Sequence, residues 1–170
     1  MNLRMVSFKR LCDSCQSHGC CTNSAAPLVF KHDLAALKSI GKSGSDYLEE
    51  ITIRNKKVLA IRKKENSTHC VFWDQNKEQC SIYANRPFDC RAYPFDISLI
   101  DGKYYWIVYS CNPDSDWNWS ESYLKELEEY MELNEIINDI DTFAGNTELI
   151  LPKESQKTPY VIIREVKIKN

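Results

Sequence analysis

Two groups of cysteines in this sequence have the spacing of metal ligands. In the first group, Cys12 and Cys15 form a CxxC pair, whose two sulfur atoms can reach one metal ion from a tight turn at about 2.3 Å. Cys20 and Cys21 follow after four further residues. Side chains of adjacent residues diverge, so these two are not expected to serve one tetrahedral ion together. Either they belong to different sites or one of them is not a ligand.

The second group centres on a stretch rich in proline and arginine. Residues 80–94 read CSIYANRPFDCRAYP, with a cysteine at the start and another inside the stretch. Pro87 suits the first position of a helical turn that would present Cys90, and the proline that closes the stretch would end this turn. Arg86 and Arg91 lie beside these thiols in the sequence. Because cationic neighbours lower the pKa of a thiol and favour the thiolate, a functional cysteine is expected here. A buried structural cysteine pair is the alternative.

The eight cysteines form one set of candidate ligands: Cys12, Cys15, Cys20, Cys21, Cys70, Cys80, Cys90 and Cys111. Their thiolates could make two four-ligand sites. Alternatively, one four-cysteine iron–sulfur cluster would use part of the set and leave thiols for a second metal or for redox chemistry. The number of thiols, the scarcity of histidines and the adjacent pair favour an iron–sulfur cluster, of the 4Fe–4S type, over zinc. His18 could also bind metal, although a polar loop histidine is the simpler interpretation.

Composition predicts a soluble, cytoplasmic protein. The 170 residues suit one domain, expected at 1–170, with a cysteine-cluster core at 12–111 and a helix and edge strand at 115–170. The net charge of -2 predicts neither nucleic acid nor an anionic membrane as partner. The N-terminus lacks the apolar run of a signal peptide, and no stretch reaches the roughly eighteen apolar residues of a membrane span. In a reducing cytosol, eight thiols indicate metal binding or redox chemistry rather than disulfides.

The elements that must position these cysteines predict an α+β fold, with a small antiparallel sheet and helices around the metal centre. One amphipathic helix is expected to begin at Asp33 as its N-cap. A second is expected around Leu48 and Ile51, with Glu49 and Glu50 facing outward. Strands are expected at 58–61, 69–73, 79–83, 95–100, 104–109 and 160–169.

Two further features shape this prediction. Asp101-Gly102 is a strong signal for a two-residue hairpin turn between the strands at 95–100 and 104–109. From Ser120, an apolar stripe predicts one long helix that continues through residues 136–140. Three aromatic residues near the start of this helix, Trp117, Trp119 and Tyr123, are expected to pack in the core or in a lid, with a ligand-stacking box as the alternative.

The cysteines belong to a recognisable series of short motifs. In order, these are the Cys-x2-Cys-x4-Cys-Cys group, Cys70-Val71-Phe72, Cys80-Ser81-Ile82-Tyr83, Arg86-Pro87, Cys90-Arg91 and Tyr93-Pro94-Phe95. The series resembles the YkgJ-type cysteine-cluster family, also called CxxCxxCC, over residues 12–111. The resemblance implies a zinc- or iron-chelating domain, and some members of the family are named flagellin N-methylases.

Two functions are compatible with these residues. In the first, the metal centre serves an enzyme that modifies a protein side chain, in the manner of a lysine N-methylase. S-adenosylmethionine is then the expected cosubstrate, and Arg86 and Arg91 hold an anionic group such as a carboxylate. The five glycines are scattered and form no nucleotide-binding loop, which argues against a Rossmann-type methyltransferase. In the second, the metal is structural or redox-active in a non-catalytic accessory module, and the arginines pair with Asp89 or Asp96.

Overall fold

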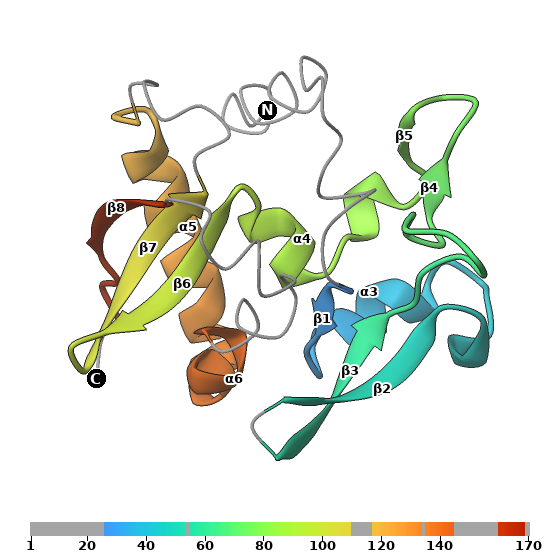
Figure 1. Ribbon diagram of the computed structural model, residues 1–170, viewed down its shortest axis with the longest axis horizontal. Helices are drawn as coiled ribbons and strands as arrows, with labels where there is room; N and C mark the ends of the chain where they lie inside the picture. Colours follow the sequence, from blue (N-terminus) through green and yellow to red (C-terminus); the bar gives the residue numbers. More distant parts are fainter. Residues whose placement is uncertain (1–25, 54, 110–116, 134, 145–159, 169–170) are drawn as a thin grey trace.

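A short helix, α4 (Phe88–Ala92), lies in the middle of the molecule between two three-stranded antiparallel sheets, as the ribbon diagram shows (Figure 1). The computed structural model describes residues 26–53, 55–109, 117–133, 135–144 and 160–168. Within these ranges, the chain forms four α-helices and small antiparallel sheets. This is the α+β architecture predicted from the sequence, and α4 lies at its centre (Figure 1).

The first sheet has the strand order β1-β3-β2 and precedes α4 in the chain. It consists of β1 (Leu28–Val29), β2 (Leu48–Ile53) and β3 (Lys56–Ile61). The helix α3 (Asp33–Lys38) and a short 3-10 helix, η1 (Gly44–Asp46), connect β1 to β2. The predicted strand at 58–61 is therefore confirmed, and the predicted helix at Asp33 begins at this residue itself, one position earlier than an N-cap at Asp33 would require.

The helix predicted around Leu48 and Ile51 is wrong, because this segment is strand β2. It pairs with β3 over its whole length, for example Ile51 with Val58. The spacing of Leu48 and Ile51 fits one face of a helix. The same segment also has the alternation of a strand, because Ile51 and Ile53 both face the core and Thr52 between them is exposed. β-Branched residues favour strands, and pairing with β3 decides between the two patterns.

Two hairpins flank α4. Before it, β4 (Trp73–Asp74) and β5 (Gln79–Cys80) pair over only two residues each, so most of the strands predicted at 69–73 and 79–83 is turn structure, including the 3-10 helix η2 (Tyr83–Asn85). After it, β6 (Phe95–Ile100) and β7 (Lys103–Tyr109) form the predicted hairpin. Its turn residues, Asp101 and Gly102, have φ values of 50° and 79°, which confirms the two-residue turn.

The long helix predicted from Ser120 is interrupted. Helix α5 (Ser120–Leu133) is followed by η3 (Ile136–Asp139) and α6 (Ile140–Ala144). Glu135 has a left-handed conformation with φ 60°, which breaks the helical path. In a continuous helix, Ile136 would point about 140° away from Met131, since five residues do not complete whole turns. The break lets both side chains enter the same core, where each is at most 1% exposed.

The last described strand, β8 (Tyr160–Glu165), pairs with β7 and forms an edge of the sheet β6-β7-β8. An edge strand was predicted here, and it ends four residues earlier than the predicted range. Figure 1 shows α5 behind this sheet, and buried residues of β6, β7, α4 and α5 form one hydrophobic cluster. A second cluster lies around α3 and β3 and includes the half-buried Cys70 and Cys80.

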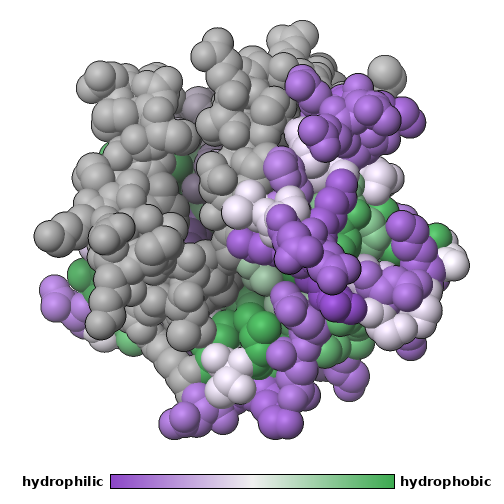
Figure 2. All heavy atoms as spheres, turned by 45° about the vertical axis from the view of Figure 1, so that its right-hand side comes forward, coloured by the Kyte–Doolittle hydropathy of each residue, from purple (hydrophilic) through white to green (hydrophobic). Residues whose placement is uncertain are grey.

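Polar side chains dominate one face of the described residues (Figure 2). On the face seen in Figure 2, hydrophilic side chains cover most of the coloured surface, and hydrophobic ones show in smaller areas between them. The exposed large hydrophobic residues that the structure describes are Leu99, Trp119, Leu133, Tyr160 and Ile162. None of the helices in the described part of the chain has the length and apolar character needed to cross a membrane.

Candidate metal centre

Helix α4 carries the central cysteine of the candidate site. Pro87 occupies the N-cap position with φ -55° and ψ 159°, and the helix begins at the next residue and ends at Ala92. A helical turn that presents Cys90 is thus confirmed, with the proline one position before the predicted one. The Tyr93–Pro94 peptide bond that follows is cis. Five residues make this helix too short to be stable alone, so other elements must hold it in place.

Two carboxylates attach α4 to the first sheet. Asp33, which is 3% exposed, accepts hydrogen bonds from the backbone N–H groups of Phe30 at 2.9 Å and Phe88 at 3.0 Å. The second bond satisfies the start of α4, where Pro87 offers no side-chain cap. On the helix itself, Asp89 accepts a hydrogen bond from the backbone N–H of Leu28 at 2.7 Å. Together these bonds position the thiol of the helix relative to β1.

Burial raises the pKa of Asp33 above its ordinary value, and four neighbours oppose this shift. The backbone N–H groups of Phe30 and Phe88 and the electrostatic influence of His32 and of Arg91 all favour the carboxylate. His32 Nε2 lies 3.1 Å from Asp33 Oδ1, but the two are not aligned for a hydrogen bond, and both ring nitrogens of His32 are buried without a hydrogen-bond partner. A mainly desolvated pair of titratable side chains, Asp33 and His32, therefore lies beside α4.

Three of the eight predicted cysteine ligands gather around this helix. The backbone of Cys70 forms an isolated antiparallel β-bridge with Lys63, and Cys80 lies opposite Trp73 in the short β4–β5 hairpin. Both are close enough to Cys90 for their negative charges to raise the pKa of its thiol. No disulfide joins these three cysteines to one another. The hairpin predicted to bring Cys70 and Cys80 together is thus short, but both cysteines do lie in the neighbourhood of Cys90.

The pKa of Cys90 differs in direction from the prediction. Loss of solvent around the thiol, together with the negative charges of Asp89, Cys70 and Cys80, raises this pKa well above its ordinary value. Arg86 lowers it, as expected from the sequence, but it is the weakest of these influences. Cys90 is only half-buried as a residue, but desolvation of its thiol is the largest cause of the raised pKa. Loss of solvent disfavours the charged thiolate and so favours the neutral thiol. Without a bound cation, Cys90 is protonated at neutral pH.

The two arginines of the site are each stacked on a tyrosine. The guanidinium of Arg86 lies 3.7 Å from the ring centre of Tyr83 and donates a hydrogen bond from Nε to the carbonyl of the same residue at 3.0 Å. The guanidinium of Arg91 lies 5.0 Å from the ring centre of Tyr130 on α5. Such cation–π contacts stabilise an arginine in a fixed orientation.

Tyr123 on α5 connects these two arginines. Its hydroxyl donates a hydrogen bond to the backbone carbonyl of Arg91. Burial raises the pKa of Tyr123, while the positive charges of both Arg86 and Arg91 oppose the shift, which places both guanidinium groups within electrostatic reach of this hydroxyl. Cationic groups and a hydroxyl donor therefore lie on the α5 side of the helix that carries Cys90.

The remaining predicted ligands lie outside the described residues. These are Cys12, Cys15, Cys20, Cys21 and Cys111, and the alternative ligand His18 lies there too. Within the described ranges, no three side chains of the His, Cys, Asp and Glu types are arranged to hold a metal ion. Cys70, Cys80 and Cys90 thus share a neighbourhood without forming a complete site by themselves. Three soft thiol donors fit the ligand preference of zinc and of iron–sulfur clusters.

Sequence reasoning expected Tyr123 only as a core or lid residue, and it missed the contacts of Tyr123 and Tyr130 with Arg91. They are seven residues apart on α5, a spacing that places both on one face of a helix. That spacing could have predicted that both tyrosines share one helix face, but nothing in the sequence shows which element this face contacts. The burial of Asp33 and its bond to Phe88 could not be predicted either, since the two residues are 55 positions apart.

Comparisons with known proteins agree with the cysteine pattern. Residues 11–112 match the model of the CxxCxxCC family, described as a "Putative zinc- or iron-chelating domain". The chain is also 32% identical over 84 residues to the uncharacterized protein MJ0661 of Methanocaldococcus jannaschii, a match that covers 49% of this chain and 44% of that protein. The chain thus spans less than half the length of this curated relative. No solved structure matches the chain.

Proposed function

Because the chain belongs to the CxxCxxCC family of zinc- or iron-chelating domains, we propose that its thiolates hold an iron–sulfur cluster, with zinc as the alternative metal. The observation that carries this proposal is the meeting of Cys70, Cys80 and Cys90, which come from three separate segments. Cysteines of the N-terminal group, within the matched residues, would complete the ligand set. When bound, such a cluster supplies electron transfer or a binding position for a cosubstrate.

The surroundings of Cys90 support a cationic occupant. Desolvation and neighbouring negative charge disfavour the Cys90 thiolate, and a bound metal cation would replace the proton and offset the charge of Asp89. Arg86 would then balance part of the negative charge of several thiolates. Binding should release protons, and metal affinity should rise with pH by about tenfold per unit for each proton released.

The metal can be identified directly. The protein is purified under anaerobic conditions, and iron, acid-labile sulfide and zinc are measured together with the visible absorption spectrum. Iron with matching sulfide and a broad visible absorption band supports the cluster. Stoichiometric zinc without sulfide contradicts the cluster and makes the centre a structural zinc site. Protein that binds neither metal after reconstitution contradicts metal binding itself.

Individual ligands can be tested by substitution. Cys70→Ser, Cys80→Ser and Cys90→Ser should each lower the metal content, whereas Ser81→Ala should keep it. Ser81 is a suitable control because it neighbours Cys80 and bonds the carbonyl of Phe72, but offers no thiolate. Removal of the metal should also lower the melting temperature, since the ligands connect distant segments of the chain. An unchanged melting temperature after chelation would show that the metal does not stabilise the fold.

An enzymatic role is the second step of the proposal, and it rests on the arginines. Arg86 and Arg91 offer cationic donors for the carboxylate of a cosubstrate beside the helix that carries Cys90, and both lie within electrostatic reach of Tyr123. We propose a carboxylate-bearing cosubstrate such as S-adenosylmethionine and a protein side chain as the methyl acceptor. A non-catalytic metal-binding or redox accessory module is the alternative.

Cosubstrate binding separates these two roles. A calorimetric titration of the metal-loaded protein with S-adenosylmethionine should show saturable binding, and Arg91→Ala should weaken this binding without loss of metal. Lys38→Ala, an exposed change on α3, serves as the control for altered charge. Absence of saturable binding favours the accessory module. Loss of metal in Arg91→Ala would instead show that the arginine maintains the metal centre.

A further inference from the structure

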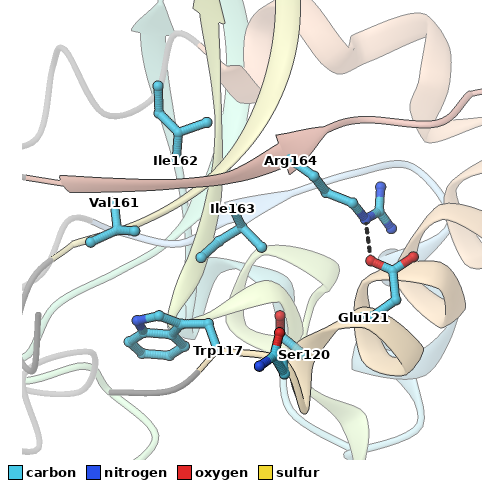
Figure 3. A pocket seen from close by; sticks show the side chains of 8 residues that line it. Trp117, Ser120, Glu121, Val161, Ile162, Ile163 and Arg164 are labelled. Atoms are coloured by element: carbon cyan, nitrogen blue, oxygen red, sulfur yellow. Dashed lines mark hydrogen bonds and ion pairs between the residues drawn. The ribbon is translucent and has the colours of Figure 1, made fainter. Parts of the chain in front are cut away.

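A groove opens between the first turn of α5 and the inner face of β8. Its volume is about 380 Å³, near the lower end of the range for small-molecule pockets. Figure 3 shows Val161 and Ile163 on the side of β8 that faces Trp117 and Ser120, whereas Ile162 points to the opposite side. The groove therefore has an apolar wall from the strand, and its other wall comes from the segment that enters α5.

A β-bulge in β8 shapes the apolar wall. The residues on either side of Ile163 pair with consecutive residues of β7, Trp106 and Ile107, so Ile163 is the extra residue of the bulge. On a regular strand, Val161 and Arg164 would face opposite sides of the sheet, because they are three positions apart. The bulge turns both toward α5, and this re-aiming of side chains is a common use of bulges beside binding sites.

Two polar atoms in the opposite wall have no hydrogen-bond partner. Ser120 is 1% exposed, and its hydroxyl is buried without a partner, as is the indole Nε1 of Trp117. A buried donor without a partner costs free energy that a ligand acceptor would recover. The indole N–H can only donate, and the hydroxyl can donate as well. Both stand at the N-terminal end of the 14-residue helix α5, where the helix dipole favours negative charge.

The charges around the groove limit the ligand to a single negative charge. Arg164 is already held by carboxylates, with Glu121 at 2.7 Å and Glu128 at 2.6 Å. Figure 3 shows the Arg164–Glu121 pair at one end of the groove. Arg164 and Lys167, whose Nζ lies 3.6 Å from Glu121, together balance the charges of Glu121 and Glu128. The attraction for an anion therefore comes from the helix terminus and the unpartnered donors. A polyanion such as phosphate would meet repulsion from Glu121.

We infer that this groove binds a small monocarboxylic acid with an apolar body. The carboxylate accepts a hydrogen bond from the Ser120 hydroxyl at the start of α5, and the apolar body lies against Val161 and Ile163, beside the indole of Trp117. Nothing in this site uses the cysteines, so the inference does not depend on the metal centre.

Nuclear magnetic resonance can test this directly, because the indole N–H of Trp117 reports on the site. Its cross-peak is assigned by its loss in Trp117→Phe, and benzoate serves as the probe. We expect a saturable shift of this cross-peak, with a dissociation constant of about 1 mM, typical of so small a ligand. Benzylamine, which has the same ring and the opposite charge, should produce no saturable shift.

The matched variants are two serines of the same helical turn. Ser120→Ala should weaken benzoate binding about tenfold, as expected for loss of one hydrogen bond to a charged acceptor. Ser122→Ala should leave binding unchanged, because Ser122 is exposed. The inference is overturned if benzoate produces no saturable shift up to about 20 mM, if Ser120→Ala binds as tightly as the parent protein, or if benzylamine binds equally well.

Discussion

The carboxylate of Asp33 lies 3.0 Å from the backbone nitrogen of Phe88 and so holds the start of α4 from a position 55 residues earlier in the chain. Asp33 uses its other oxygen to accept the N–H of Phe30. One buried side chain therefore fixes the segment after β1 and the helix that carries Cys90 at the same time. The position of the thiol depends on this carboxylate as much as on the residues of the helix.

Replacement of Asp33 by alanine should lower the free energy of unfolding by about 2–4 kcal/mol, because two buried backbone N–H groups lose their acceptor. Urea denaturation measures this change, and metal content should fall with it if Asp33 positions Cys90. Asp139→Ala, at an exposed aspartate, should change the stability little. An equal effect of both substitutions would show that the Asp33 bonds contribute nothing specific.

The raised pKa of Cys90 predicts a pH dependence for the metal-free protein. Above the ordinary thiol pKa of about 8.5, the unfolded chain loses the Cys90 proton while the folded protein keeps it. The unfolded state then binds fewer protons, so the free energy of unfolding should decrease as pH rises from there toward the raised pKa of the folded state. Cys90→Ala should reduce this decrease in denaturation measurements between about pH 8 and pH 10. The same slope in both proteins would contradict the assignment to Cys90.

Glu128 should be critical for the attachment of β8 to α5. It is 4% exposed and accepts hydrogen bonds from Arg164, from the indole of Trp106 and from the backbone N–H of Lys167. Glu128→Ala should lower the free energy of unfolding by about 3–5 kcal/mol, since it leaves these buried donors without their acceptor. Chemical denaturation can compare it with Glu129→Ala, whose side chain is exposed and whose effect should stay below about 0.5 kcal/mol.

The hairpin after α4 offers a test of backbone conformation. Gly102 has φ 79° and no atom near the position of an added Cβ, so the cost of Gly102→Ala should come from the left-handed backbone alone, about 1–2 kcal/mol. Gly44→Ala is the control, because Gly44 has no such backbone conformation and a Cβ there would make only ordinary contact with Leu48 at 3.6 Å. Thermal denaturation should show a lower melting temperature for the first variant only.

Local signals in the sequence were sufficient for several elements around the site. Pro87 predicted the turn that presents Cys90, because a proline restricts its own φ wherever it occurs. Asp101-Gly102 predicted the β6–β7 hairpin, since few residues other than glycine and Asn or Asp tolerate that turn. The cysteine and arginine motifs visible in the sequence likewise indicated the family whose model matches residues 11–112.

Long-range packing settled the features that local signals left open or predicted wrongly. Residues 48–53 carry both a helical and an alternating pattern, and only pairing with β3 selects the strand. The pKa of Cys90 depends on desolvation and on charges from Cys70 and Cys80, which are 20 and 10 residues away, and these outweigh the neighbouring Arg86. Backbone propensity acts over a few residues, whereas burial and electrostatic fields depend on everything that folding brings together. The sequence therefore determines which thiols are available, and the tertiary structure determines which of them meet and in which protonation state.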